Sequence, residues 1–154
     1  MGVRLLPADP LGPGLRPLVE RHLADMLAAS PPGSSHALDP AGLAGSGVRF
    51  LALQEGAEVL GFGALKLLEP GHAELKSMHV RAGLRGRGLG RALLRGLVAE
   101  ARGMGVVRLS LETGVQPPYA AAVALYRAEG FADCPPFAGY RPDPASLFLT
   151  RVLD

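Results

Sequence analysis

The chain has 154 residues, of which 48% are hydrophobic, so it is long and apolar enough to bury a core and is not expected to be disordered. Its formal net charge is only +2 and its aromatic content is 5%, which argues against the basic, aromatic-rich surface of a nucleic-acid-binding protein. No apolar run reaches the roughly 18 residues that a membrane span requires.

The location is predicted from the N-terminus and from cysteine usage. The stretch MGVRLLPADPLGPG has prolines where a signal peptide would have its apolar segment, and Cys134, the single cysteine, has no internal partner for a disulfide. No cysteine and histidine cluster suggests a metal site. We expect a cytoplasmic protein with no metal, no membrane partner and no nucleic-acid partner; no sequence signal favours or excludes a homodimer.

The first third of the chain predicts a strand, a helix and a long loop. A short strand is expected at Val3–Leu6. Apolar residues at a helical period predict a helix at Leu15–Ala29. The segment Ser30–Gly47 is rich in proline, glycine and serine, which predicts a loop with one short helix after Asp39.

The middle of the chain predicts three strands, a helix and a further strand. Val48–Gln54 and Val59–Leu68 read as an antiparallel hairpin closed by the turn EGAE. Ala73–Val80 is a strand that leads into a glycine-rich loop, and the helix after this loop extends to about Arg102. Val106–Glu112 is the next strand.

The last part predicts one helix and two strands. Tyr119–Gly130 has a helical pattern that Gly130 would end as a C-cap. FADC and Ser146–Leu153 are expected strands, separated by the proline-rich stretch PPFAGYRPDP. Neither an internal repeat nor a second domain is visible, so residues 1–154 are predicted to form one domain.

The segment RAGLRGRGLGRALL predicts an anion-binding site. Three of its four glycines, Gly86, Gly88 and Gly90, allow the backbone to approach a ligand closely, and the first amides of the following helix have no intrahelical partners. The helix dipole and three arginines add positive charge, so a phosphate or pyrophosphate is the expected guest. The residues concerned are Arg85, Gly86, Arg87, Gly88, Gly90 and Arg91.

Three phosphate-binding patterns compete for this loop. The Walker loop requires Gly-Lys-Ser/Thr, but Gly90 is followed by Arg91 and Ala92. The dinucleotide fingerprint would place Arg91 where its third glycine belongs, although Glu112 stands about where its acidic residue would be. Too few residues follow Glu112 for the rest of a doubly wound sheet. The pattern Arg/Gln-x-x-Gly-x-Gly/Ala matches RGRGLG at every fixed position.

This last pattern resembles the GNAT superfamily of acetyl-CoA-dependent N-acyltransferases. ELKSMHVRAGLRGRGLGRALL is similar to the family's acetyl-CoA strand and loop, and ALYRAEGF is similar to its second signature. The stretches SPPGSSHALD, GHAELKSM, LETG and PPFAGYRPDPASLF also resemble a bacterial subgroup of small-molecule acetyltransferases. One departure is Tyr119, which stands where the family often has a cofactor-binding asparagine.

The resemblance implies an α+β fold: a mixed, largely antiparallel sheet of six or seven strands, about four helices, and central strands that splay apart. It implies that Tyr126 is the catalytic acid beside the cofactor sulfur, and that Glu74 is the base. Strict alternation along the strand would place Glu74, Lys76, Met78 and Val80 on one face. The implied cofactor contacts are Met78, His79, Val80, Arg85, Gly86, Arg87, Gly88, Leu89, Gly90, Arg91 and Tyr119.

The predicted function is the transfer of an acetyl group from acetyl-CoA, the cosubstrate, to an amine of a small molecule by direct attack. Two alternatives remain at this stage. One is acetylation of protein N-termini or lysines by the same fold, and the other is a CoA-binding module without turnover. The acceptor is expected to be chosen by the loops Ser30–Gly47 and Pro135–Pro144, whose spacing carries no code.

Overall fold

The computed structural model describes residues 2–34 and 36–154 and is built on one seven-stranded sheet. The strands lie in the order β1-β2-β3-β4-β5-β7-β6. All neighbours are antiparallel except β4 and β5, which are parallel. The strands are β1 Arg4–Pro7, β2 Val48–Glu55, β3 Glu58–Glu69, β4 His72–Val80, β5 Arg108–Gly114, β6 Ala132–Asp133 and β7 Ser146–Val152.

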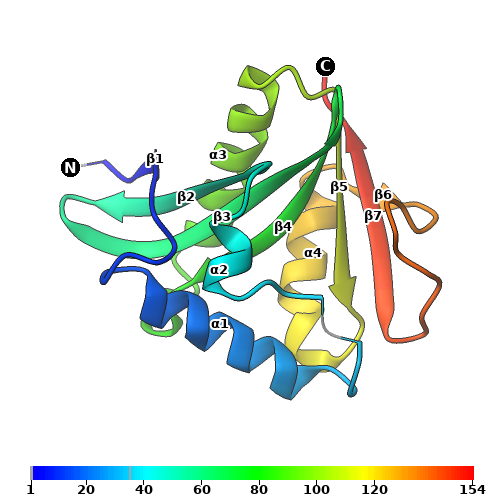
Figure 1. Cartoon of the computed structure of the whole chain (residues 1–154), viewed down its shortest axis with the longest axis horizontal. Coiled ribbons are helices and arrows are strands. Elements are labelled where there is room, and N and C mark those ends of the chain that lie inside the picture. Colours follow the sequence, from blue (N-terminus) through cyan, green and yellow to red (C-terminus); the bar gives the residue numbers. More distant parts are fainter. Residues whose placement is uncertain (1, 35) are drawn as a thin grey trace.

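Helices cover both faces of the sheet, with α1 and α2 on one face and α3 and α4 on the other (Figure 1). The short helix predicted after Asp39 is present, and the Asp39 carboxylate caps it by accepting the Gly42 amide at 2.8 Å. In the described residues, no helix is long and apolar enough to span a membrane. The helices are α1 Arg16–Ala29, α2 Pro40–Leu43, α3 Leu89–Gly103 and α4 Ala120–Ala128, with 3-10 turns η1 Ala82–Leu84 and η2 Pro117–Tyr119.

Both faces of β2 are buried because its alternating side chains enter two different apolar layers. Phe50 and Ala52 belong to the cluster shared with α1 and α2, whereas Leu51 and Leu53 belong to the larger cluster shared with α3. The period-2 alternation of the strand therefore divides the core in two. The sheet is held rigidly between the two helical layers, and this fixes the positions of β4 and β5.

The strands β4 and β5 pair over a short length and then separate. Their parallel register runs only from His72 opposite Arg108 to Glu74 opposite Ser110, and beyond this point the strands diverge (Figure 1). The splay of the central strands is confirmed. The β4 edge from Leu75 to Val80 therefore has no strand partner on its β5 side.

A bulge in β4 changes which side chains share a face. Leu65 of β3 lies opposite Leu75 and Ala64 lies opposite Ser77, so Lys76 is an extra residue in the ladder. Leu75 and Met78 consequently both pack in the α3 layer. The prediction that Glu74, Lys76, Met78 and Val80 share a face was wrong, because the bulge reverses the alternation. The residues that face α1 are Glu74, Ser77 and His79.

Candidate active site

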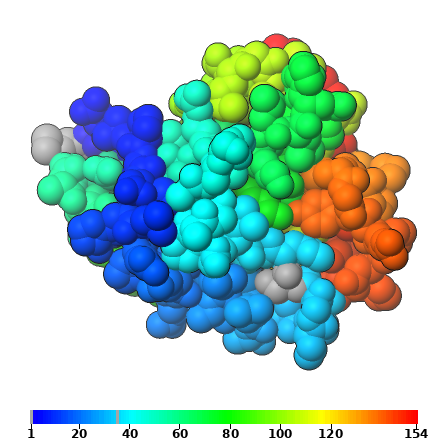
Figure 2. Space-filling view, in the orientation of Figure 1, coloured from blue at the N-terminus to red at the C-terminus, as the bar shows by residue number. Residues whose placement is uncertain are grey.

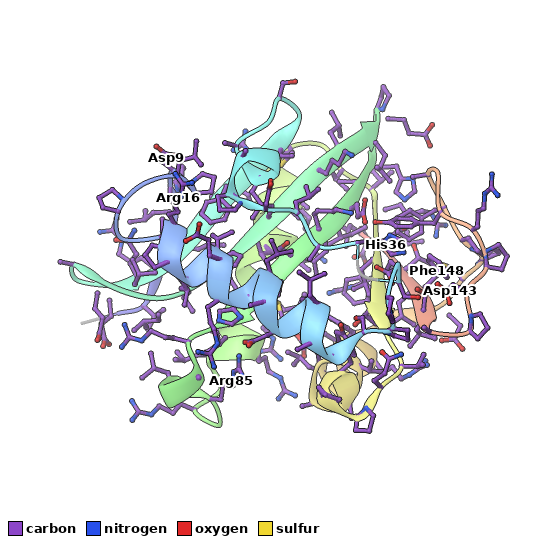
Figure 3. All side chains as sticks on the ribbon, turned by 60° about the horizontal axis from the view of Figure 1, so that its bottom comes forward. Asp9, Arg16, His36, Arg85, Asp143 and Phe148 are labelled. Carbon is purple, nitrogen blue, oxygen red and sulfur yellow. The ribbon has the colours of Figure 1, made fainter. Side chains whose placement is uncertain are left out.

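A cavity of about 720 Å³ occupies the gap between β4 and β5. It is lined by α1 on one side and by the start of α3 and one face of α4 on the other. Figure 3 shows two labelled lining residues at opposite ends, with Arg85 beside the glycine loop and His36 near Asp143 and Phe148. The cavity therefore connects the predicted anion site with the loops predicted to choose the acceptor.

The glycine loop has the geometry of an open cradle. Gly86 and Gly88 have φ of 85° and 76°, and a Cβ on either would meet nothing within 4 Å. Gly88 is the N-cap of α3 and provides no side-chain cap, so the first amides of the helix remain available to an anion. Of the predicted loop contacts, those on the cavity wall are Arg85, Gly86, Leu89 and Gly90, whereas Arg87, Gly88 and Arg91 are not on it.

The free edge of β4 also borders the cavity, through Met78, His79 and Val80. The His79 ring points toward α1, where its Nδ1 lies 3.1 Å from Nδ1 of the buried His22. Burial lowers the pKa of each ring to about 4, with a smaller contribution from neighbouring positive charge. Both rings are therefore neutral at pH 7, and one donates its Nδ1 proton to the other.

Tyr126 lies on the cavity wall at the end of α4, and its side chain is almost completely buried. Its hydroxyl has no hydrogen-bond partner in the part of the chain that the structure describes. Burial raises the pKa of Tyr126 to about 12, so the hydroxyl carries its proton at neutral pH. The predicted acid thus presents a free O–H group to the cavity.

Tyr119 borders the same cavity but uses its hydroxyl to connect two elements. The hydroxyl shares a 2.5 Å hydrogen bond with the Ser30 hydroxyl and donates to the Met26 carbonyl at 3.4 Å. These contacts fasten the segment before α4 to the C-terminal end of α1.

Glu74 belongs to a buried polar network at the other end of the cavity. The Tyr140 hydroxyl donates to Oε2 of Glu74 at 2.5 Å and accepts from the Lys76 ammonium at 2.7 Å. Lys76 is also within 3.6 Å of Glu74, so the two form an ion pair. Burial, together with the Glu74 carboxylate, raises the pKa of Tyr140. The predicted base is therefore already engaged by a cation and a hydroxyl.

The sequence analysis missed Glu112 as a site residue. Glu112 lies on β5, two residues beyond Ser110, where β4 and β5 part, and it lines the cavity with Glu74. The Ser146 hydroxyl donates to its Oε2 at 2.8 Å, and burial raises the pKa of its carboxyl group. The signal that could have identified Glu112 was its position at the end of a predicted strand. The sequence analysis considered this position only as part of a dinucleotide fingerprint.

Two loops roof the acceptor end of the cavity. The Ser34 hydroxyl donates to Asp143 at 3.1 Å, and the His36 and Tyr140 rings meet edge to face at 5.1 Å. In Figure 2 the segment after α1 abuts the connection between β6 and β7 on this face. In residues 2–34 and 36–154, no group of three histidine, cysteine or acidic residues is placed to hold a metal ion.

A cleft between splayed strands, with a glycine cradle at one end, is the architecture of an acyltransferase that binds a CoA thioester. The sequence model of the Acetyltransferase (GNAT) family matches residues 16–131. The chain belongs to this family and is an acetyltransferase with the GNAT fold.

Individual relatives agree with the family assignment. The chain is 46% identical over 141 residues to the uncharacterized N-acetyltransferase YedL of Escherichia coli (strain K12), covering 92% of this chain and 89% of that protein. It is 43% identical over 136 residues to the IAA acetyltransferase of Azospirillum brasilense, covering 88% and 86%. The crystal structure of a "putative acyl-CoA N-acyltransferase" from Klebsiella pneumoniae matches with a TM-score of 0.79 at 31% identity, covering 99% and 98%.

Proposed function

We propose that the protein moves the acetyl group of acetyl-CoA onto the amino group of a small molecule. The observation that carries the proposal is the continuous cavity, which joins the glycine cradle at α3 to the buried Glu74 and half-buried Glu112 carboxylates through the gap between β4 and β5. A CoA thioester and an amine can meet only where these two ends communicate.

The donor would enter from the side of α3. The cradle amides around Gly86–Gly90 and the Arg85 side chain suit a pyrophosphate, and the unpaired edge of β4 suits the amides of the pantetheine arm. A free amide of Met78–Val80 would then face the thioester carbonyl. Such an oxyanion donor is typically worth roughly 10²–10³ in rate.

The transfer requires the loss of protons from the amine. An ammonium acceptor loses one proton to become a nucleophile, and its nitrogen loses a second as the C–S bond of the tetrahedral intermediate breaks. The products are an amide, CoA thiol and one released proton. The proposed proton acceptor lies in the carboxylate pair: Glu74 was predicted from the sequence, and Glu112 is added because no ion pair engages it in the described residues.

Tyr126 is proposed to assist the leaving sulfur. Its pKa of about 12 exceeds the thiol reference of about 8.5, so complete proton transfer to the thiolate is uphill by about 5 kcal/mol. We therefore assign Tyr126 a hydrogen bond to the departing sulfur, and solvent supplies the thiol proton.

A small acceptor is favoured over a polypeptide by the roof of the cavity. The Ser34–Asp143 hydrogen bond and the His36–Tyr140 contact close the side on which a protein substrate would need an open groove. The name of the Azospirillum relative also points to a small acceptor. The proposed location is the cytoplasm, and residues 1–154 are proposed to form a single domain.

The test is acceptor-dependent release of CoA thiol. Purified protein with acetyl-CoA is assayed against a set of small amines and against peptides with free N-termini or lysines. We expect thiol release with at least one small amine and none with the peptides. Release with peptides alone would favour protein acetylation, and release that no acceptor changes would overturn the proposal.

A further inference from the structure

We propose that the acceptor is a cationic amine with no carboxylate beside its amino group, and that the Glu112 side chain selects it by charge. The inference deepens the proposed function and rests on it. It starts from the charges on the cavity wall and from the partners that each of them already has.

The acceptor end carries one more negative charge than positive charge. Glu74 and Lys76 form an ion pair, whereas Glu112 has only the neutral Ser146 hydroxyl as a partner in the described part of the chain. Even a half-buried carboxylate without an ion-pair partner is destabilised, which agrees with the pKa of Glu112 being raised by burial. A ligand that brings an ammonium group supplies the missing positive charge.

The other cations of the cavity wall are engaged or distant. Arg21 of α1 forms an ion pair with Asp25 at 3.0 Å and is largely exposed. Arg85 stands at the opposite, donor end, where its Nε donates to the Val80 carbonyl at 3.1 Å (Figure 3). Neither one balances Glu112, and the basic groups of the wall whose charge acts on its carboxyl are His36 and the already paired Lys76.

Lys76 is not free to bind the carboxylate of an amino acid. Its side chain is 9% exposed, and its ammonium is held by the Tyr140 hydroxyl and by Glu74. The carboxylate of an α-amino acid lies two bonds from its amino nitrogen, so it would stand close to Glu74 and Glu112 without a free cation. The like-charge contact disfavours amino acids relative to the amines that lack this group.

Two uncharged features of the wall also fit such an amine. The Ser77 hydroxyl is buried, lines the cavity and has no hydrogen-bond partner in the described residues, so it is left for a ligand. The Tyr140 ring already tolerates a cation, with the Lys76 nitrogen 5.3 Å from its centroid. Among the residues that the structure describes, the wall therefore offers a neutral hydrogen-bonding group and an aromatic face, but no lysine or arginine without a partner.

The experiment compares matched acceptors that differ by one carboxylate. Initial rates with saturating acetyl-CoA are measured for tyramine against tyrosine and for phenethylamine against phenylalanine, since each amino acid has a single amino group and it lies beside the carboxylate. In each pair in which the enzyme acetylates at least one member, we expect kcat/KM to be at least tenfold higher for the amine than for the amino acid. Glu112→Gln should reduce this ratio toward one, because it removes the charge and keeps the shape. The matched control, Glu20→Gln on the exposed face of α1, should retain the ratio.

A binding measurement separates this inference from the proposed reaction. Calorimetry follows tyramine and tyrosine binding to protein saturated with CoA, where no transfer can occur. Tighter binding of tyramine that Glu112→Gln abolishes supports the inference even if turnover is absent and the proposed reaction fails. Three outcomes would overturn the inference: equal or tighter binding of tyrosine, no binding of either probe, or a preference for tyramine that is unchanged in Glu112→Gln. The proposed acetylation could still stand after any of them.

Discussion

Tyr126 offers the simplest test of a single atom, since phenylalanine removes only its hydroxyl. The ring packs beside Phe131 at 6.0 Å, and this packing should survive in Tyr126→Phe. We expect acetyl-CoA affinity close to that of the wild type and a fall in kcat of at least tenfold, about 1.4 kcal/mol, from the lost hydrogen bond to sulfur. Thiol release at saturating substrates measures it. An unchanged kcat would make Tyr126 a packing residue.

A pH series tests whether Glu74 or Glu112 accepts the proton of the ammonium group. If one of them accepts the ammonium proton, its Glu→Gln variant should lose most rate below the pKa of the amine and recover as pH rises, because glutamine cannot take a proton. We expect this profile for Glu74→Gln or Glu112→Gln, measured as kcat over a pH series with one amine. A defect of constant size across pH in both variants would indicate positioning instead.

Single residues also show where sequence reasoning stops. Tyr126 and the glycines were found because their motifs are local in the chain. Glu112 faces Glu74 across 38 positions, and this proximity depends on the parallel register of β4 and β5, which no local pattern encodes. The Glu74–Tyr140 hydrogen bond likewise depends on a loop whose path the sequence leaves open.

At the scale of elements, a bulky substitution at the start of α3 should weaken the binding of acetyl-CoA. Gly88→Val places a branched side chain in a left-handed conformation at the open cradle, so acetyl-CoA affinity should fall at least tenfold. Gly47→Val is the matched control, because Gly47 also has positive φ and open space but lies just before β2 and not at the start of α3. Calorimetry compares them. Equal losses in both variants, or none in a folded Gly88→Val protein, would contradict the phosphate-cradle assignment.

The docking of α1 on β4 should be sensitive to acid. The pKa of His22 and of His79 is lowered in the folded protein, so between pH 6.5 and about 4 the unfolded chain binds more protons and stability falls as pH falls. His22→Gln removes one of these groups and should flatten the decline. Chemical denaturation at pH 7, 6 and 5 measures the slopes. Parallel slopes for the two proteins would show that the pair does not govern acid stability.

Helix faces were more predictable than strand faces. The buried side of α3, with Leu93, Leu97 and Ala101, follows the helical period directly. In β4 the single extra residue Lys76 reverses the alternation, and nothing in the pattern of apolar residues marks a bulge. The position of the strand was therefore confirmed, while the side that Glu74 faces could not be derived.

On the scale of the whole molecule, the cavity divides the sheet into two halves that a donor would bridge. Acetyl-CoA that contacts both the β4–α3 side and α4 should therefore stabilise the entire fold. At 100 times its Kd the gain is about 2.7 kcal/mol, which corresponds to a Tm increase of roughly 5–10 °C for a chain of this size. Thermal unfolding with and without acetyl-CoA measures it, and Gly88→Val should show a smaller shift. An equal shift in Gly88→Val would argue for binding elsewhere.

The overall architecture was predictable because its cues are distributed along the chain. Strand and helix patterns, the turn EGAE and the motif resemblance agreed, and the seven-stranded α+β fold is confirmed. The roof over the acceptor end could not be predicted, because it depends on a contact between two proline-rich loops through Ser34 and Asp143. Such contacts are set by the tertiary structure.

The bulged strand β4 lets two substrates be controlled independently. In the proposed reaction its backbone edge would bind the donor, and any residue except proline presents the same amide there. Its side chains Glu74, Ser77 and His79 lie on the α1 face, and of these Glu74 belongs to the proposed acceptor end. Exchange of these side chains can retune the choice of acceptor and leave the donor edge intact. One strand would thus separate recognition of the donor, by its backbone, from recognition of the acceptor, by its side chains.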